Sequence, residues 1–290
     1  MELNMEGMWD THLHLFDPDL YPYKSTRTYT PSPASLDAWI EQIRADRLVL
    51  VQASIEDGPA GLIGHLGRIR NDYPRLLARG IICMDESWEK LTQADCDTLH
   101  NLGVRYCRIH GFFGGGRTDT LAIKEQISVF ANSYPCRTFG WGLSAQLPLD
   151  TWSSLKDFLL NDPEVSHLSV IADHVGCAKP TDIGQSSLHD FVQLLQSGRI
   201  NVKISALYRR SGESLADMKS IIRLYADSAP FALIWGSDWP HVDSSSRSSK
   251  DRVTSIAADP NNEIMLLRSW LSKDQFRSML VDNPERLFAH

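Results

Sequence analysis

Short apolar runs alternate along the chain with segments in which apolar residues recur at helical spacing. The stretch 7–17 predicts a first strand, and seven further runs are apolar almost throughout. Strands of this kind are typical of a parallel sheet whose two faces are both covered. The seven later strands are predicted at residues 47–54, 78–84, 104–110, 140–147, 167–174, 200–206 and 231–238.

A segment with helical spacing lies between each predicted strand and the next. Ser35 opens the first of these segments and suits the N-cap position, because its hydroxyl can accept a hydrogen bond from the first helical turn. The helices are predicted at residues 35–43, 60–73, 92–102, 121–133, 152–160, 188–195 and 215–225, and a capping turn with a short last helix is predicted at 282–288.

Eight strand-then-helix units, roughly 25 to 40 residues apart, match the size and plan of a (β/α)₈ barrel, also called a TIM barrel. An open doubly wound sheet would need a glycine-rich turn after the first strand. The chain has His12-Leu13-His14 there instead. We therefore predict an α/β protein with a (β/α)₈ barrel. Because no linker-like stretch interrupts the pattern, we expect a single domain over residues 1–290.

The composition is that of an ordinary globular protein, since 42% of the 290 residues are apolar and 22% are charged. The net charge of −7 comes without a basic cluster, so we expect no nucleic-acid partner.

No apolar run approaches the ~20 residues that cross a bilayer, and the first residues lack the pattern of a signal peptide, so we expect no membrane segment. Five scattered cysteines favour reduced thiols and a cytoplasmic protein.

The first predicted strand carries polar side chains where an apolar stripe is expected. His12 and His14 are separated by one residue and so point to the same face of a strand, and Asp10 falls on that face too. A barrel of this type builds its active site at the C-terminal ends of its strands, so polar residues at those ends can be interpreted together. They are His12, His14, Arg108, His110, Gln146, His174, Lys203, Ser205, Tyr208, Arg209 and Asp238. Three histidines and an aspartate at one rim predict a functional site.

Seven motifs, in order over essentially the whole chain, carry a resemblance to a known family. They are Asp10-Thr11-His12-Leu13-His14, Tyr29-Thr30-Pro31, Val51-Gln52-Ala53-Ser54, Asp173-His174-Val175-Gly176, Val202-Lys203-Ile204-Ser205 with Tyr208-Arg209, Trp235-Gly236-Ser237-Asp238-Trp239-Pro240-His241, and Asp282-Asn283-Pro284. The chain resembles the amidohydrolase superfamily, in the branch called amidohydrolase family 2. Within that branch it is most similar to the 2-pyrone-4,6-dicarboxylate hydrolase and sugar-lactonase group.

The resemblance implies hydrolysis of a lactone or pyrone-like cyclic ester of a small organic acid. Asp238 would act as the general base that takes a proton from the attacking water. The catalytic histidines, which polarise the carbonyl and stabilise the oxyanion, would be His12, His14 and His174. The matching substrate-binding positions are Arg108, Tyr29, Ser54, Gln146, Tyr208, Arg209 and His241. The expected partner is thus a small-molecule substrate, and arginine suits a carboxylate on it because its planar fork binds two oxygens.

The resemblance also bears on metal binding. Many members of the superfamily bind one or two divalent ions through the His-x-His pair, a lysine on the fourth strand, a histidine on the fifth and the aspartate of the eighth. Here the fourth strand ends in Cys107-Arg108-Ile109-His110 and the fifth in Gln146, so a two-metal site is not expected. We expect no metal cofactor, with the histidines as direct hydrogen-bond donors. The alternative is one Zn²⁺ held by His12, His14 and Asp238, with water in the fourth position.

One departure from the family pattern affects the substrate. Cys177 follows Gly176 where the family commonly has arginine or lysine, and Lys179 two places later is the candidate to replace that contact. The glycine-rich segment 111–117 is expected to shape a wider, less polar pocket. Two other functions stay open: a zinc-dependent decarboxylase of an aromatic or muconate-type acid, and a catalytically inactive barrel that serves as a binding module.

Overall fold

The computed structural model describes residues 5–110, 119–243 and 251–290. Its barrel strands are β1 (Trp9–Leu13), β3 (Arg47–Val51), β4 (Leu77–Cys83), β5 (Val104–His110), β6 (Gly142–Gln146), β7 (Val170–Ala172), β8 (Ile200–Ile204) and β9 (Leu233–Trp235). They form one sheet in this order, and all neighbouring strands run parallel. The sheet closes through a parallel bridge between Leu13 and Trp239, which follows β9. The predicted α/β barrel is confirmed.

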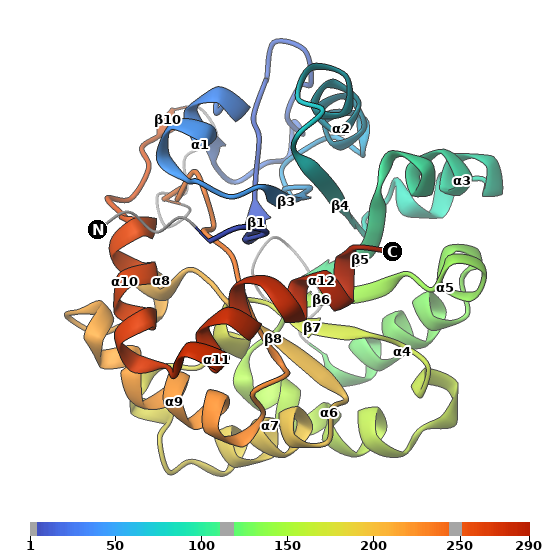
Figure 1. Cartoon of the computed structure of the whole chain (residues 1–290). Helices are drawn as coiled ribbons and strands as arrows, with labels where there is room; N and C mark the ends of the chain where they lie inside the picture. Colours follow the sequence, from blue (N-terminus) through green and yellow to red (C-terminus); the bar gives the residue numbers. More distant parts are fainter. Residues whose placement is uncertain (1–4, 111–118, 244–250) are drawn as a thin grey trace.

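Helices surround the strands (Figure 1). They are α1 (Leu36–Gln42), α2 (Ala60–Asp72), α3 (Gln93–Leu102), α4 (Thr120–Ala131), α5 (Tyr134–Phe139), α6 (Leu149–Asn161), α7 (Ser186–Gln196), α8 (Leu207–Arg210), α9 (Lys219–Ser228), α10 (Pro260–Trp270), α11 (Lys273–Arg277) and α12 (Asn283–Phe288). A separate parallel pair joins β2 (Thr30–Pro31) to β10 (Arg252–Val253). Ser35 caps α1 as predicted, since its side chain accepts a hydrogen bond from the Ala38 amide.

Four helices were not predicted: α5, α8, α10 and α11. The segment 134–139 is too short to show a helical period, and it ends at Gly140 with φ of 69°. The predicted strand 167–174 is also shorter in the structure, because β7 ends at Ala172 and His174 turns away with φ of 53°. This early exit from the sheet places His174 in a 3₁₀ turn, His174–Cys177, at the end of the barrel.

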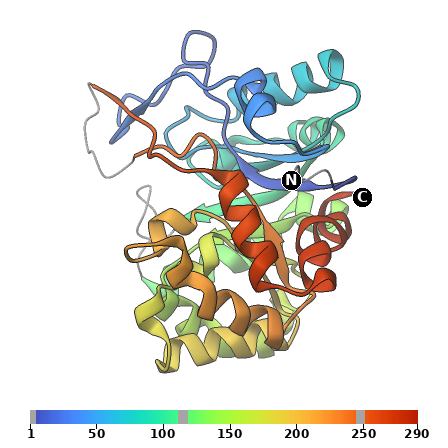
Figure 2. The same ribbon diagram turned by 60° about the vertical axis from the view of Figure 1, so that its left-hand side comes forward.

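The interior of the barrel is a separate apolar cluster that α12 closes at one end. Its members are Trp9, Val49, Val51, Ile81, Tyr106, Ile171, Ile234, Leu287 and Phe288. The ring of Phe288 lies 5.8 Å from that of Trp9 and 5.0 Å from that of Tyr106. In Figure 1, α12 lies in front of the barrel strands. Figure 2 shows the same red C-terminal segment from the side, next to the end of the chain. Trp9 is the first residue of β1 and Tyr106 the third residue of β5, so α12 covers the N-terminal end of the barrel and leaves the C-terminal end for the site.

The first strand contains a bulge that changes which side chains face inward. Asp10 pairs with Leu48, whereas Leu13 pairs with Leu50, so β1 holds one residue more than β3 over this interval. An extra residue of this kind interrupts the strict alternation of a strand. Asp10 and His12 therefore do not share a face.

Asp10 lies outside the site and has a structural role. Its carboxylate accepts hydrogen bonds from Trp39 Nε1 at 2.9 Å and from Ser237 Oγ at 2.6 Å, which ties α1 and the end of β9 to β1. The prediction that Asp10 lies beside His12 and His14 is therefore wrong, because the bulge turns its side chain toward the helices.

Two further expectations concern the chain as a whole. All five cysteines are buried and unpaired, so the predicted free thiols are confirmed. Within the described ranges, no helix combines the length and the apolar character needed to cross a membrane. The predicted pocket wall at 111–117 lies outside the described residues.

Candidate active site

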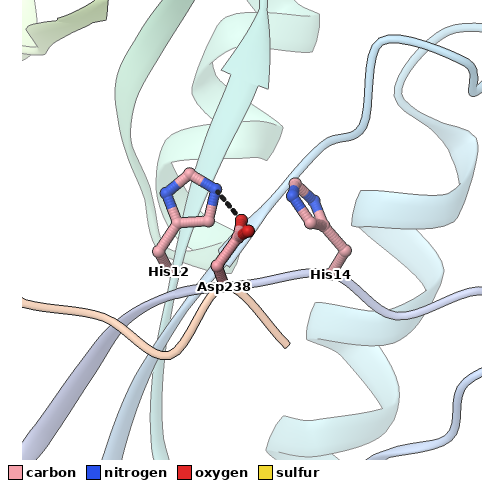
Figure 3. Close-up of side chains that lie close together, drawn as sticks. All are labelled: His12, His14 and Asp238. Atoms are coloured by element: carbon pink, nitrogen blue, oxygen red, sulfur yellow. Dashed lines mark ion pairs between the residues drawn. The ribbon is translucent and has the colours of Figure 1, made fainter. Parts of the chain in front are cut away.

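The structure brings the four predicted catalytic residues together at the C-terminal end of the barrel. The Asp238 carboxylate lies between the rings of His12 and His14 (Figure 3). Asp238 Oδ1 is 3.7 Å from His12 Nε2 and 3.9 Å from His174 Nε2. One ligand-type atom from each of His12, His14 and Asp238 lies within 4.8 Å of the other two. The first, sixth and last strands of the barrel thus contribute to one cluster.

The closure of the barrel sets this geometry. The Asp238 amide donates to the carbonyl of His12 at 2.8 Å, and the His14 amide donates to the carbonyl of Trp239 at 2.9 Å. Asp238 has φ of 59°, a left-handed conformation that is uncommon outside glycine and turns the side chain toward β1. Gly236 permits the close approach, because a Cβ there would lie 2.6 Å from the Cβ of His12.

Asp238 is held in its ionised form. Its Oδ2 accepts hydrogen bonds from Tyr208 Oη at 2.6 Å and from Arg209 Nε at 3.2 Å. Burial by itself raises the pKa of this carboxyl, but His174, Arg209 and the other donors around it outweigh burial and bring the pKa below its usual range. Oδ2 is fixed by two donors, whereas Oδ1 faces the histidines.

The histidines are held neutral. Burial is the largest cause that lowers the pKa of His14 to about 4 and that of His174 to about 3. Burial also brings the pKa of His12 well below its usual value, with the Lys203 charge as the next cause. His14 Nδ1 donates to the carbonyl of Val51 at 2.7 Å, which leaves Nε2 as a lone-pair donor.

Neutral histidines can bind a divalent cation, because each ring then has one nitrogen with a free lone pair. Nε2 of His12 has no hydrogen-bond partner although it is buried. Lys203 Nζ and Asp173 Oδ1 lie on the other side of this ring, 3.2 Å and 3.8 Å from Nδ1, so Nε2 faces the site. Nε2 of a neutral imidazole binds a metal ion through its lone pair when the ring proton is on Nδ1, and the Asp173 carboxylate on that side favours this tautomer. Two neutral imidazoles and one carboxylate fit a single metal ion with an open position, which agrees with the donor chemistry of zinc.

Arg108 belongs to a second group of buried side chains beside the histidines. Its Nε donates to Asp173 Oδ2 at 2.9 Å, and its Nη2 donates to Gln146 Oε1 at 3.1 Å. Asp173 Oδ1 accepts from Ser144 Oγ and pairs with Lys203 Nζ, each at 2.9 Å. Burial raises the pKa of Asp173, but Lys203 and Arg108 outweigh it and hold the pKa well below its usual range. The predicted substrate contacts Arg108 and Gln146 therefore lie together.

Asp173 and Lys203 were noted in the sequence, Lys203 as a rim residue and Asp173 within a family motif, but neither was predicted to have a catalytic or binding role. Asp173 stands directly before His174 at the end of an apolar run. Lys203 is a charged residue inside the fully buried strand β8, between Val202 and Ile204. A charge at such a position needs a partner, and only the folded barrel shows that the partner is Asp173.

The remaining predicted substrate contacts border the cluster. Tyr29 is half-buried and hydrogen-bonded to Ser54; burial is the largest cause of its raised pKa, and Asp238 also contributes. The ring of His241 lies 5.6 Å from that of Tyr208. His241 also lines a cavity of about 690 Å³ between α1, α2 and the segment 255–258, and none of the four predicted catalytic residues lines this cavity.

Lys179, the candidate to replace the cation that the family commonly has after the glycine of this motif, is exposed, and its charge acts on the pKa of Cys177. Arg210 of α8 is buried instead, and its charge acts on the pKa values of both His174 and Cys177. The cation on this side of the site comes from a helix that the sequence pattern did not predict.

Eight parallel strands closed into a barrel, with a His-x-His pair on the first strand and an aspartate after the last, define an amidohydrolase-type barrel. The amidohydrolase family model matches residues 9–289, and the chain belongs to this family, as predicted.

Three known proteins are similar over nearly the whole chain. 4-sulfomuconolactone hydrolase of Hydrogenophaga intermedia is 30% identical, over 98% of this chain and 89% of its own. D-galactarolactone isomerase of Agrobacterium fabrum is 31% identical, over 97% and 91%. 2-pyrone-4,6-dicarboxylate hydrolase of Comamonas testosteroni is 25% identical, over 97% and 90%. By name, these relatives are hydrolases and an isomerase that act on small acids and their lactones.

Two solved structures share the fold. A protein of Agrobacterium tumefaciens has a TM-score of 0.75 at 19% identity, over 98% of this chain and 96% of its own. An amidohydrolase of Burkholderia multivorans, solved with bound zinc, has a TM-score of 0.60 at 16% identity, over 97% and 99%.

The prediction of a site without a metal cofactor is corrected by these observations. His12, His14 and Asp238 form a cluster of three ligands, and an amidohydrolase of the same fold holds zinc. The missing lysine and the Gln146 side chain argue only against a second ion. They leave three ligands for one ion, which is the number that catalytic zinc sites use.

Proposed function

We propose that the protein hydrolyses a lactone or pyrone-like cyclic ester of a small organic acid. The observation that carries this proposal is the position of Asp238 Oδ1, which faces two buried neutral histidines while Oδ2 is fixed by Tyr208 and Arg209. The names of the relatives, two of them lactone or pyrone hydrolases, support the substrate class.

In this proposal Asp238 is the general base. Oδ1 takes a proton from a water molecule as the water oxygen bonds to the carbonyl carbon, and the proton then passes to the ring oxygen as the ring C–O bond breaks. The lowered pKa keeps the carboxylate ionised at neutral pH, so it is ready to accept the proton. His12, His14 and Asp238 would hold a divalent cation, which when bound supplies Lewis-acid polarisation of a carbonyl.

The second group of side chains suits binding of the acid part of the substrate. Arg108 is fixed at two points by Asp173 and Gln146, so its guanidinium is oriented before a substrate arrives. His174 links Arg108 to Asp238, because its Nε2 lies 3.4 Å from Arg108 Nη2 and 3.9 Å from Asp238 Oδ1. An oriented guanidinium favours a carboxylate or another planar or tetrahedral anion.

A second candidate is isomerisation of a lactone, which the 31% identity to a galactarolactone isomerase favours. In that reaction a hydroxyl of the substrate, rather than water, would attack the carbonyl. The two reactions differ in their product, because hydrolysis opens the ring and releases an acid.

The test is a screen of purified protein against pyrone dicarboxylates, sugar lactones and muconolactones. Acid release is followed with a pH indicator, ring isomers by NMR and CO₂ by a coupled assay. We expect acid release that a chelator abolishes and Zn²⁺ restores. Asp238→Asn should lower kcat by about 10²- to 10⁴-fold, because the amide cannot accept the proton.

Asp72→Asn is the matched control, since Asp72 is exposed on α2 and should leave kcat unchanged. Three results would contradict the proposal: CO₂ as the product would indicate a decarboxylase, ring isomers without acid would indicate an isomerase, and full activity of Asp238→Asn would remove its role as base. Lack of turnover on the whole panel, with tight binding of a lactone, would indicate a binding module.

A further inference from the structure

A buried carboxylate that takes no part in the proposed reaction lies directly behind the candidate ligands. Asp173 has no exposed surface, and its Oδ1 lies 3.8 Å from Nδ1 of His12, on the side of the ring opposite the site. The same carboxylate contacts two buried cations, Lys203 and Arg108, each at 2.9 Å. Ser144 donates a further hydrogen bond to Oδ1. Asp173 is therefore fixed by three donors.

The ion pairs of the cluster indicate that the Asp173 carboxylate offsets positive charge beside the candidate metal ligands. Three cations meet two carboxylates: Lys203, Arg108 and Arg209 against Asp173 and Asp238. The cluster already has one positive charge in excess, and loss of the Asp173 charge would double that excess. An uncompensated ammonium 3.2 Å from one nitrogen of His12 opposes binding of a divalent cation at the other nitrogen of the same ring.

We propose that Asp173 is a positioning residue that enables the site to hold a divalent cation. It offsets the charges of Lys203 and Arg108 and supports the Nδ1 side of His12, the arrangement in which a carboxylate behind a histidine strengthens that histidine as a ligand. The inference rests on the proposed function only in that the bound cation would polarise the carbonyl of the substrate. Its test measures binding without substrate, so the two proposals can fail separately.

The experiment titrates chelator-treated protein with Zn²⁺ alone, in competition with a chromogenic chelator. Asp173→Asn should weaken Zn²⁺ binding at least about tenfold. Lys203→Met should bind Zn²⁺ as tightly as the wild type or more tightly, because it removes a like charge. The double variant Asp173→Asn/Lys203→Met should recover much of the lost affinity, because the two opposite charges leave together. A purely structural role for Asp173 would give no such recovery.

Glu263→Gln is the matched control. Glu263 is also a buried carboxyl, and Trp235 Nε1 donates to it at 2.9 Å. Burial raises the pKa of Glu263 to about 8, so it is protonated at pH 7 and an amide removes no charge. We expect unchanged Zn²⁺ affinity for this variant.

The proposal is overturned by any of three results. They are wild-type affinity in Asp173→Asn, a double variant that binds no better than Asp173→Asn, and a tenfold loss of affinity in Lys203→Met. If Asp173→Asn does not fold, Lys203→Met and the double variant decide, and the double variant must then bind within tenfold of the wild type. The expected affinities together with no lactone hydrolysis would retain this inference and remove the proposed function.

Discussion

At the scale of single residues, burial acts in opposite ways on the histidines and the carboxylates of the site. The imidazoles of His14 and His174 lose their protons, because no neighbour stabilises the charged ring enough to offset burial. Asp173 and Asp238 stay ionised, because cations and hydrogen-bond donors contact both oxygens of Asp173 and Oδ2 of Asp238. The result is a set of lone-pair nitrogens beside ionised oxygens.

This contrast predicts how stability depends on pH. Between the ordinary histidine value of 6.5 and about 4, the unfolded chain binds a proton at His14 that the folded chain does not bind. Stability therefore falls as the pH falls through this window, by about 1.4 kcal/mol per pH unit for each such histidine. Asp173 and Asp238 affect stability in another pH range. Because their pKa values are lowered from 3.8, the stability that they contribute is lost only as the pH falls below 3.8.

Urea unfolding of chelator-treated protein at pH 7, 6 and 5 measures this slope. His14→Gln should make the slope of unfolding free energy against pH smaller by the contribution of one histidine, about 1.4 kcal/mol per pH unit. Equal slopes for His14→Gln and the wild type would contradict the neutral assignment of His14.

At the scale of elements, the contact between the two strands that close the barrel positions the site. The carbonyl of His12 accepts the amide of Asp238, so the base and a candidate ligand are joined through one backbone bond. Asp10, behind the bulge of β1, holds Ser237 of the same junction through a side-chain bond of 2.6 Å. A small shift between β1 and the end of β9 would therefore displace both His12 and Asp238.

Gly236→Ala tests this junction. A Cβ at Gly236 would lie 2.6 Å from Cβ and 2.7 Å from N of His12, so the strands must separate. We expect the free energy of unfolding to fall by about 1–3 kcal/mol and kcat to fall with it, measured by urea unfolding and by the hydrolysis assay.

Gly67→Ala gives the control in the opposite direction. Gly67 lies within α2, and nothing lies within 4 Å of a Cβ placed there. Alanine should stabilise the helix by about 0.8–1 kcal/mol without a change in kcat. A destabilised Gly67→Ala, or a Gly236→Ala variant with wild-type activity, would refute the argument from close approach.

At the scale of the whole molecule, stability and chemistry lie at opposite ends of the barrel. Phe288 and Leu287 of α12 fill the N-terminal end, and Arg79 donates to the carbonyls of Phe288 and Ala289 at 2.7 Å and 3.0 Å. Arg105 reaches the carbonyl of His290 in the same way. The last helix thus closes the core at the end away from His12 and Asp238.

Phe288→Ala should therefore separate stability from function. Removal of a fully buried ring from this cluster should cost about 3–5 kcal/mol of unfolding free energy, while KM stays within twofold because the substrate binds at the other end. Leu121→Ala, at an exposed position of α4, should change stability by less than about 0.5 kcal/mol. A large change in KM for Phe288→Ala would show that the two ends are coupled.

Seven of the eight barrel strands were predictable because each lies in a run that is apolar almost throughout, which the sequence marks directly. The short helices α5, α8 and α11 have six residues or fewer, too few to show a helical period. α10 is long enough, but it follows the last strand, beyond the repeating units that the pattern defines. Asp10 was misplaced because a bulge depends on the pairing partner and not on the strand alone.

The alternation of apolar runs and helical segments was enough to predict the barrel, and the motifs were enough to predict the family. Because strand-end positions of one barrel share a rim, the sequence also predicted that His12, His14, His174 and Asp238 lie together. The tertiary structure was needed to show that Asp10 lies outside the site, that Arg210 is buried whereas Lys179 is exposed, and that Asp173 joins Lys203 to Arg108. It also showed that one ligand-type atom each of His12, His14 and Asp238 lies within 4.8 Å of the other two, an arrangement that could hold a metal ion. Local patterns fix which faces are buried, whereas pairing between distant charges exists only once the strands have closed.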